Sequence, residues 1–256
     1  MKFIFKGYTL FILLVILTIV SLFIGVSQLS LIDIFHLSDE QMNILYSSRI
    51  PRTVSILLSG SSLALSGLIM QQMMQNKFVS PTTAGTMEWA KLGILLSLLF
   101  FPNGHILIKL LFAVVLSIVG TFLFVQLINL IRVKDVIFVP LLGIMIGGIL
   151  SSFTTFVALR TNALQSIGNW LTGNFAVITS GRFEVLYLTI PLLILAFVFA
   201  NHFTIAGMGK DFSHNLGVSY EKIINIALFI TAALTALALF AAFVGIAGID
   251  GIDIYR

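Results

Sequence analysis

The sequence predicts an all-α protein, a bundle of helices that crosses a membrane several times. Hydrophobic residues make up 59% of its 256 residues and charged residues only 9%, and its mean hydropathy is +1.11. A soluble domain carries roughly 25% charged residues, so this composition excludes one. The apolar runs are long and continuous, without the alternation that is typical of strands. About 20 such residues cross a bilayer as a helix.

Seven apolar runs are candidate spans. They cover residues 8–28, 53–74, 85–101, 106–131, 136–159, 184–203 and 223–248. The first run is too long for a signal peptide and has no small-residue cleavage site, so we expect it to be retained. The third run carries Glu88 and Lys91, which at this spacing can form an interfacial ion pair on one helix face.

Basic residues set the orientation, because they are enriched in cytoplasmic loops. With a cytoplasmic N-terminus, eight basic residues lie inside: Lys2, Lys6, Lys77, Lys91, Arg132, Lys134, Lys210 and Lys222. Five lie outside: Arg49, Arg52, Lys109, Arg160 and Arg182. We therefore expect the N-terminus in the cytoplasm. The small net charge of +4 gives no support to nucleic-acid binding, and the absence of cysteine excludes disulfides and thiolate metal sites.

Two arginines on the outer side, Arg49 and Arg52, stand at the mouth of the second span. Pro51 between them suits the first turn of a helix. The arginines either anchor the span to lipid phosphates or dock an acidic external partner. Small residues follow from Ser59 to Gly67, and we expect them to let neighbouring helices approach closely.

A polar turn at residues 75–85, the inner turn, separates the second and third spans. Its marked residues are Asn76, Pro81 and Gly85. Pro81 lacks an N–H group and disfavours helix in Ser80, and Gly85 can adopt conformations forbidden to side chains. Unpaired backbone groups in lipid cost several kcal/mol each, so we expect this turn to lie in water or against protein at a membrane surface.

Two further loops carry signals. Helical spacing of apolar residues before and including Trp170 predicts a short interfacial helix, since tryptophan favours the headgroup level. On the inner side, Asp211 and Gly217 predict the start and end of a one-turn helix. A plain connector needs fewer residues than 209–218, so this segment is expected to contact a soluble partner.

Together these motifs resemble the permease subunits of iron–siderophore and cobalamin ABC importers, the FecCD-type family. The similarity runs from roughly residue 40 to 245, and residues 76–87 are similar to the branch that serves catechol-type ferric siderophores. The matching residues are Arg49, Pro51 and Arg52; Gln71, Asn76, Pro81 and Gly85; Trp170 and Gly173; and Gly209, Leu216, Gly217 and Val218.

The resemblance implies a type II ABC importer permease of the bacterial cytoplasmic membrane, without catalytic residues, metal site or cofactor of its own. The implied partners are an ABC ATPase, a second and different permease, a substrate-binding protein, a ferric siderophore and membrane lipid. Arg49 and Arg52 would grip the binding protein, and Val133, Lys134 and Asp135 would form the cytoplasmic gate. The residues implied in ATPase coupling are Gly209, Ser213, Asn215, Leu216, Gly217 and Val218.

The chain departs from this family at its end. We take residues 1–256 as one transmembrane domain with about seven spans, whereas family members have about ten and carry a Phe-x-Gly-Leu-x-x-Pro element after the seventh. Residues 245–256 lack that Phe and Pro, and they place Asp250 and Asp253 in an apolar tail, where charge is expensive in lipid. We therefore expect a chain that is incomplete at its C-terminus.

Two other functions remain as alternatives. An ion-coupled secondary transporter usually holds ionisable residues at the bilayer midplane, but residues 8–28, 53–74, 110–131 and 223–243 contain none. An intramembrane hydrolase needs a Ser/His, paired Asp or metal-binding set inside the spans, and the sequence offers no such set. Both alternatives are therefore disfavoured.

Overall fold

The computed structural model describes residues 7–24, 38–130, 138–161, 175, 178–181 and 183–247, and these residues form helices joined by turns. The all-α prediction is confirmed. The α-helices are α1 (Gly7–Phe23), α2 (Asp39–Ile44), α3 (Ile50–Met73), α4 (Thr86–Phe100), α5 (Ile106–Leu130), α6 (Phe138–Arg160), α8 (Thr189–Val198), α9 (Ala200–Ala206), α10 (Lys210–Asn215) and α11 (Tyr220–Ala247). A π-helical segment, η2 (Leu45–Arg49), joins α2 to α3, and a 3₁₀ segment, η4 (Phe183–Leu188), precedes α8.

Four helices of the described chain are long and apolar enough to cross a bilayer: Asp39–Met73, Ile106–Leu130, Phe138–Arg160 and Tyr220–Val244. Phe183–Val198 and Ala200–Ala206, which bend by 54°, make a fifth if they form one broken span. The first and third predicted spans are shorter helices, α1 with 17 residues and α4 with 15. At 1.5 Å per residue α4 is ~22 Å long, less than the ~30 Å of a bilayer core.

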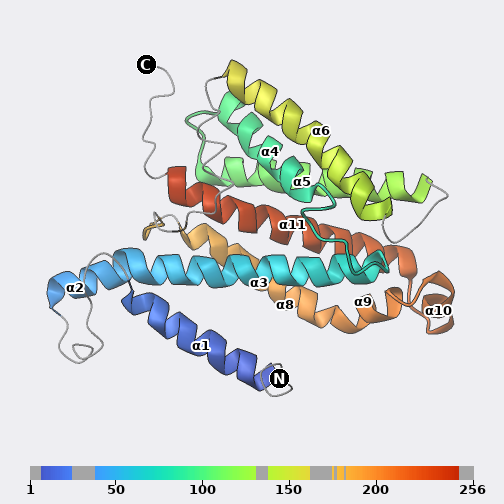
Figure 1. Ribbon diagram of the computed structural model, residues 1–256, viewed down its shortest axis with the longest axis horizontal. Coiled ribbons are helices and arrows are strands. Elements are labelled where there is room, and N and C mark those ends of the chain that lie inside the picture. The colour runs from blue at the N-terminus through green and yellow to red at the C-terminus, as the bar shows by residue number, and fades with distance from the viewer. Residues whose placement is uncertain are drawn as a thin grey trace.

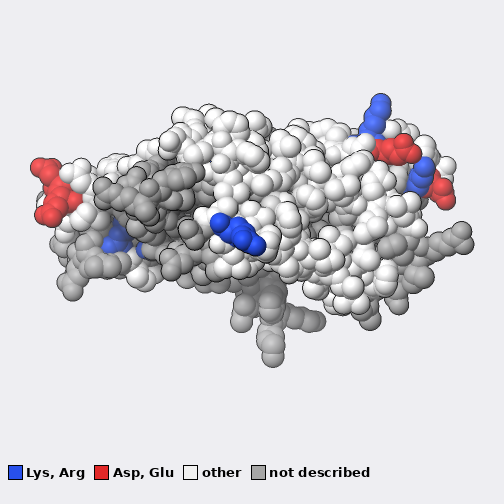
Figure 2. All heavy atoms as spheres, turned by 90° about the horizontal axis from the view of Figure 1, so that it is seen from above, with Lys and Arg blue, Asp and Glu red and all other residues white. Residues whose placement is uncertain are grey.

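Charged groups gather at the two ends of the molecule. Figure 2 shows acidic atoms and, close to them, partly hidden basic atoms toward the end where α2 lies, mixed charges at the opposite end, and a largely uncharged surface between them with one basic side chain near its centre. Asp39 and Glu40 of α2 and Lys210 and Glu221 of the opposite end are all exposed. This distribution is what a membrane-spanning bundle requires, because charge is costly in the hydrocarbon core.

Helix α11 is the axis of the bundle. Of its membrane-length window 89% is buried, against 22% for α6, and α3, α4, α5 and α8 pack around it (Figure 1). Lipid is as apolar as leucine, so membrane helices associate by close packing rather than by the hydrophobic effect. The alanines of α11 allow neighbours to approach from several sides; those buried are Ala227, Ala232, Ala233, Ala236, Ala238, Ala241 and Ala242.

Buried hydroxyl groups join the neighbouring helices to α11. Ser117 of α5 donates a hydrogen bond to the Ala232 carbonyl at 2.9 Å, and Ser66 of α3 lies 3.4 Å from the Thr231 carbonyl oxygen. Such bonds between membrane helices contribute ~0.6 kcal/mol each on average. They therefore fix the register of α3 and α5 against α11 more than they drive packing.

The Arg49–Arg52 motif stands at the start of α3 with Pro51 in its first turn, as predicted, but a further helical stretch precedes α3. This stretch begins at Asp39, capped by Ser38, and continues through η2 into α3. Pro51 cannot donate to the Ser47 carbonyl, and this carbonyl instead accepts a hydrogen bond from the Ser180 N–H at 2.9 Å. The missing N–H group of Pro51 thus leaves the Ser47 carbonyl free to join this helix to the segment before η4.

The small residues of α3 only partly act as predicted. Ser59, Ser62 and Ser66 are buried, in agreement with close packing, but Gly60 and Gly67 face open space. The spacing explains the difference, because positions 59, 62 and 66 share one helix face while Gly60 lies on another.

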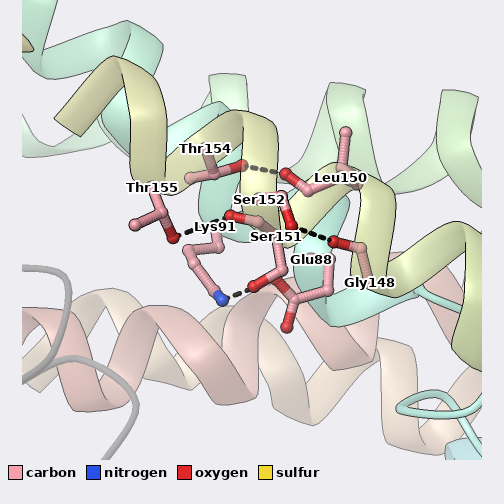
Figure 3. A network of polar contacts seen from close by, with 8 residues as sticks. All are labelled: Glu88, Lys91, Gly148, Leu150, Ser151, Ser152, Thr154 and Thr155. Atoms are coloured by element: carbon pink, nitrogen blue, oxygen red, sulfur yellow. Dashed lines mark hydrogen bonds and ion pairs between the residues drawn. The ribbon is translucent and has the colours of Figure 1, made fainter. Parts of the chain in front are cut away.

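The predicted pairing of Glu88 and Lys91 is confirmed. The Lys91 ammonium contacts the Glu88 carboxylate within α4, with side-chain exposures of 3% and 23% (Figure 3). The pair lies close to α6, since a Cβ built on Gly147 of that helix would be 3.8 Å from the Glu88 Cγ. Lys91 is therefore buried inside the bundle, and its charge depends on Glu88 for compensation.

Helix α6 contacts the inner turn through its glycines. A Cβ placed on Gly143 would lie 1.8 Å from the Thr83 carbonyl oxygen and 2.9 Å from the Phe124 ring. A Cβ on Gly148, five residues further along, would meet nothing within 4 Å. Only a glycine at position 143 allows this approach of the two backbones.

We predict that Gly143→Ala lowers stability by ~1–3 kcal/mol, since it forces extra volume against a backbone carbonyl. Gly148→Ala is the matched control and should be neutral or slightly stabilising, because alanine is the better helix former. Thermal unfolding of the purified variants in detergent compares them. Equal midpoints for the two variants would show that the 83–143 contact is not tight.

We predict that Lys91→Met destabilises the chain by up to ~3 kcal/mol, because it leaves Glu88 without its partner in a mostly buried site. The double variant Lys91→Met/Glu88→Gln should regain most of this loss. The same unfolding measurement tests both. A double variant that is as unstable as Lys91→Met alone would mean that the lysine stem, not its charge, matters.

Candidate functional site

One end of the bundle gathers the segments that the sequence singled out as cytoplasmic. The inner turn, the C-terminus of α5, the N-terminus of α6 and helix α10 all lie together there, opposite α2 (Figure 1). We call this the inner end. The predicted common side of residues 75–85 and 209–218 is therefore confirmed as a common end of the molecule.

The inner turn is packed into the protein. Asn76, Pro81 and Gly85 are buried, and Val79 and Ala84 join a cluster with Met70, Phe124, Val139 and Leu228. Gly85 has φ +73° and caps α4, and the Asn76 Oδ1 accepts the Phe78 N–H at 2.9 Å. The prediction that the turn lies against protein is thus confirmed. The left-handed conformation of Gly85 allows the chain to enter α4 directly beside Gly147 of α6. A Cβ built on Gly147 would lie 3.7 Å from the Gly85 Cα.

Helix α10 is the short helix that the sequence predicted, starting one residue earlier, at Lys210. Gly209 with φ +109° precedes it and Gly217 with φ +71° follows it. The buried Ser213 donates to the Gly209 carbonyl at 2.8 Å, and its own carbonyl accepts the Val218 N–H at 2.9 Å. Ser213 therefore holds the segment in shape, and its side chain does not reach the surface.

The exposed face of α10 is apolar at two points. Phe212 is 47% and Leu216 is 54% exposed, although the segment around them is polar. Lys210 pairs with Glu221 at the start of α11 at 3.3 Å, and since both side chains are well exposed this pair contributes little stability. Two apolar side chains on an exposed rigid helix are a suitable anchor for a soluble partner.

A cavity of about 570 Å³ lies next to α10, between the inner ends of α3, α5 and α11. Its lining mixes apolar and polar side chains, and the residues include Met73, Met74, Gln126, Asn129, Tyr220 and Asn225. In the described part of the chain no group of three or more acidic, histidine or cysteine residues is placed to hold a metal ion. The inner end therefore offers contact surfaces and free volume.

The two arginines of the outer end differ in accessibility. Arg49 is only 5% exposed, whereas Arg52, nearly one turn further along the helix, is partly exposed. An acidic partner arriving from outside can reach Arg52 without rearrangement of the bundle. Arg49 can meet it only if the neighbouring chain moves.

Several predicted residues lie outside the described part of the chain. These are the gate residues Val133, Lys134 and Asp135, the external-helix residues Trp170 and Gly173, and the tail residues Asp250 and Asp253.

Sequence reasoning missed the glycines that receive the inner turn. Gly143 and Gly147 form a Gly-x-x-x-Gly pattern, the usual signal for close helix approach in membranes, and this pattern could have identified them. It also missed Gln75, whose backbone has φ +49°. No sequence signal marks that position, because glycine and asparagine are the residues expected in this conformation.

Known proteins share both the sequence and the fold. The FecCD transport family matches residues 13–248. The petrobactin import system permease protein YclN of Bacillus subtilis (strain 168) is 50% identical over 230 residues, which cover 90% of this chain and 73% of that protein. The petrobactin permease FatD of Bacillus anthracis is 38% identical, and the ferric-anguibactin permease FatD of Vibrio anguillarum is 34% identical. These two alignments cover 88% and 85% of this chain, and 64% and 69% of the relatives.

The fold has a solved counterpart. An inward-facing structure described as a metal-chelate type ABC transporter superposes with a TM-score of 0.74 at 22% identity, covering 91% of this chain and 74% of that one. The family match spans the bundle from α1 to α11 and includes the inner turn and α10. The chain is a multi-pass permease of the cytoplasmic membrane, not an enzyme, and it belongs to the FecCD transport family.

Proposed function

We propose that this chain is the membrane subunit of an ABC importer that carries a ferric siderophore, of catechol type, into the bacterial cell. Three relatives between 34% and 50% identical are named as siderophore permeases, which supports this substrate class. The complete importer would contain an ATPase, a binding protein and a second, different permease.

The observation that carries the proposal is the exposed helix α10 at the inner end. A permease of this kind performs no bond chemistry, so it needs a firm contact through which a separate ATPase can move it. α10 is flanked by two glycines with positive φ and held by Ser213, and Phe212 and the following Leu216 are exposed. In this proposal Leu216 fills an apolar pocket of the ATPase, while Gly209, Asn215, Gly217 and Val218 shape the segment around it.

The remaining predicted residues keep their proposed roles. Arg52, with Arg49 behind it, docks the binding protein on the outer side through charge-assisted hydrogen bonds. Val133, Lys134 and Asp135 form the cytoplasmic gate. The inner turn with Asn76, Pro81 and Gly85 connects the end of α3 to α4 at the inner end of the bundle.

We predict that Leu216→Asp abolishes siderophore-dependent iron uptake. Removing a buried apolar anchor costs ~2 kcal/mol or more, or about thirtyfold in affinity for the ATPase. His214→Asp adds the same negative charge at an exposed position of α10 without removing this apolar anchor, and it should retain most of the uptake. The assay measures radioactive iron uptake from a ferric catechol siderophore in iron-limited cells that have the partner subunits but no other copy of this permease.

Two outcomes of this assay decide between explanations. If the unaltered chain supports no uptake from any ferric siderophore, the proposed function is wrong. If it supports uptake and Leu216→Asp does so equally well, α10 is not the ATPase contact.

We predict that Arg52→Glu weakens binding-protein association by ~2 kcal/mol or more, since charge reversal turns an attractive contact into a repulsive one. Arg160→Glu makes the same charge change at another exposed helix end on the predicted outer side, and it should have little effect. Affinity is measured with the purified binding protein and the permease in nanodiscs. If the two variants lose affinity for the binding protein equally, the arginine contributes only general electrostatic attraction. If neither variant loses affinity, Arg52 does not dock the binding protein.

A further inference from the structure

Gln75 has an unusual backbone conformation. Among the described residues it is the only one other than glycine with a positive φ, +49°. Residues with a Cβ rarely adopt this region, and such outliers persist only where the surrounding structure holds them. A glycine would fit this position at lower cost, so the retained side chain requires an explanation.

The Gln75 side chain reaches the segment that leads into α10. Its Nε2 donates a hydrogen bond to the Gly207 carbonyl at 3.0 Å, although the two residues are 132 positions apart. The same nitrogen lies 3.6 Å from a Cβ built on Gly209. Gly207 in turn approaches the end of α3, with the Gln72 carbonyl 3.1 Å from a Cβ built on it. The end of α3 therefore contacts the junction between α9 and α10 directly.

Beyond Gln75 the chain is firmly attached to other helices. Val79 and Ala84 are buried in the cluster with α5, α6 and α11, and the Thr83 carbonyl abuts Gly143 of α6. Contacts thus run without a break from α10 through Gln75 and the inner turn to α6. A cavity of about 270 Å³ borders Gln75, Asn76 and Gly209, so the connection has free volume beside it.

We propose that Gln75 is a positioning residue that ties α10 to the inner turn, so that a displacement of α10 is passed on to α6. This inference rests on the proposed function, in which the ATPase moves α10. The side chain matters because it bridges two segments, and the left-handed backbone matters because it directs the amide toward Gly207.

Two substitutions test the tie. Gln75→Gly relieves the backbone and removes the amide; Gln75→Asn tolerates the left-handed conformation and keeps an amide, but it is one methylene shorter. In the assembled importer we expect ATP hydrolysis near the parental rate and siderophore uptake reduced about fivefold, the scale of one hydrogen bond. The number of ATP molecules consumed per siderophore should rise accordingly.

A second measurement does not depend on transport. The chain has no cysteine, so a cysteine introduced at the exposed Asn215 carries a single spin label on α10. In the purified chain the label should become more mobile in both variants, while the unfolding temperature stays at or above the parental value for Gln75→Gly.

Each outcome has a defined meaning. Unchanged label mobility overturns the tie. If the label becomes more mobile but the number of ATP molecules consumed per siderophore stays at the parental value, the positioning role is wrong. The positioning role is also wrong if uptake falls only as much as the stability of the variant falls. If the parental importer itself shows no ATP-driven uptake, the proposed function fails, and the label still reports whether the tie exists.

Discussion

The structure depends on how closely its backbones can approach one another. In lipid no hydrophobic force drives apolar helices together, so close contact must supply the attraction. The alanines of α11 allow this close contact at the centre of the bundle. Gly93 supplies it between α4 and α5, where a Cβ would lie 2.5 Å from the Phe112 carbonyl oxygen, and Gly143 supplies it between α6 and the inner turn.

The same need for close backbone contact determines where the inner turn lies. A turn of eleven residues could not lie among membrane helices unless its polar groups were satisfied by protein. Within the inner turn, the Ala84, Gly85 and Thr86 N–H groups donate to the carbonyls of Ser80, Thr82 and Pro81 respectively. With these backbone groups bonded and with Val79 and Ala84 buried, the turn can stand between α10 and α6. A rigid connection of this kind is what a permease needs in order to respond to a partner that binds only at its surface.

Much of this was readable from the sequence. Long apolar runs predicted the helices, and Pro81, Gly85 and Gly217 predicted the turn and the short helix at the inner end. The spacing of Glu88 and Lys91 predicted their pairing. Pro51 was correctly placed in the first turn of α3, but the helical residues 39–49 before it were not predicted, because a proline inside a longer helix requires that another donor bonds the carbonyl it leaves unpaired. Here Ser180 does so by donating to the Ser47 carbonyl, a contact between residues 133 positions apart that no local pattern reveals. Likewise, the burial of Arg49 and the reach of Gln75 to Gly207 depend on tertiary packing and leave no trace in local composition.

Reconstitution gives the most direct test of the central claim that the chain transports siderophores at the expense of ATP. The permease would be placed in liposomes with its ATPase and second permease, and the binding protein loaded with a ferric catechol siderophore would be added on the opposite side from the ATP. We expect iron to accumulate only when hydrolysable ATP is present, and to be unaffected when ionophores collapse ion gradients. Accumulation that needs an ion gradient but no ATP would contradict the account and favour a secondary transporter.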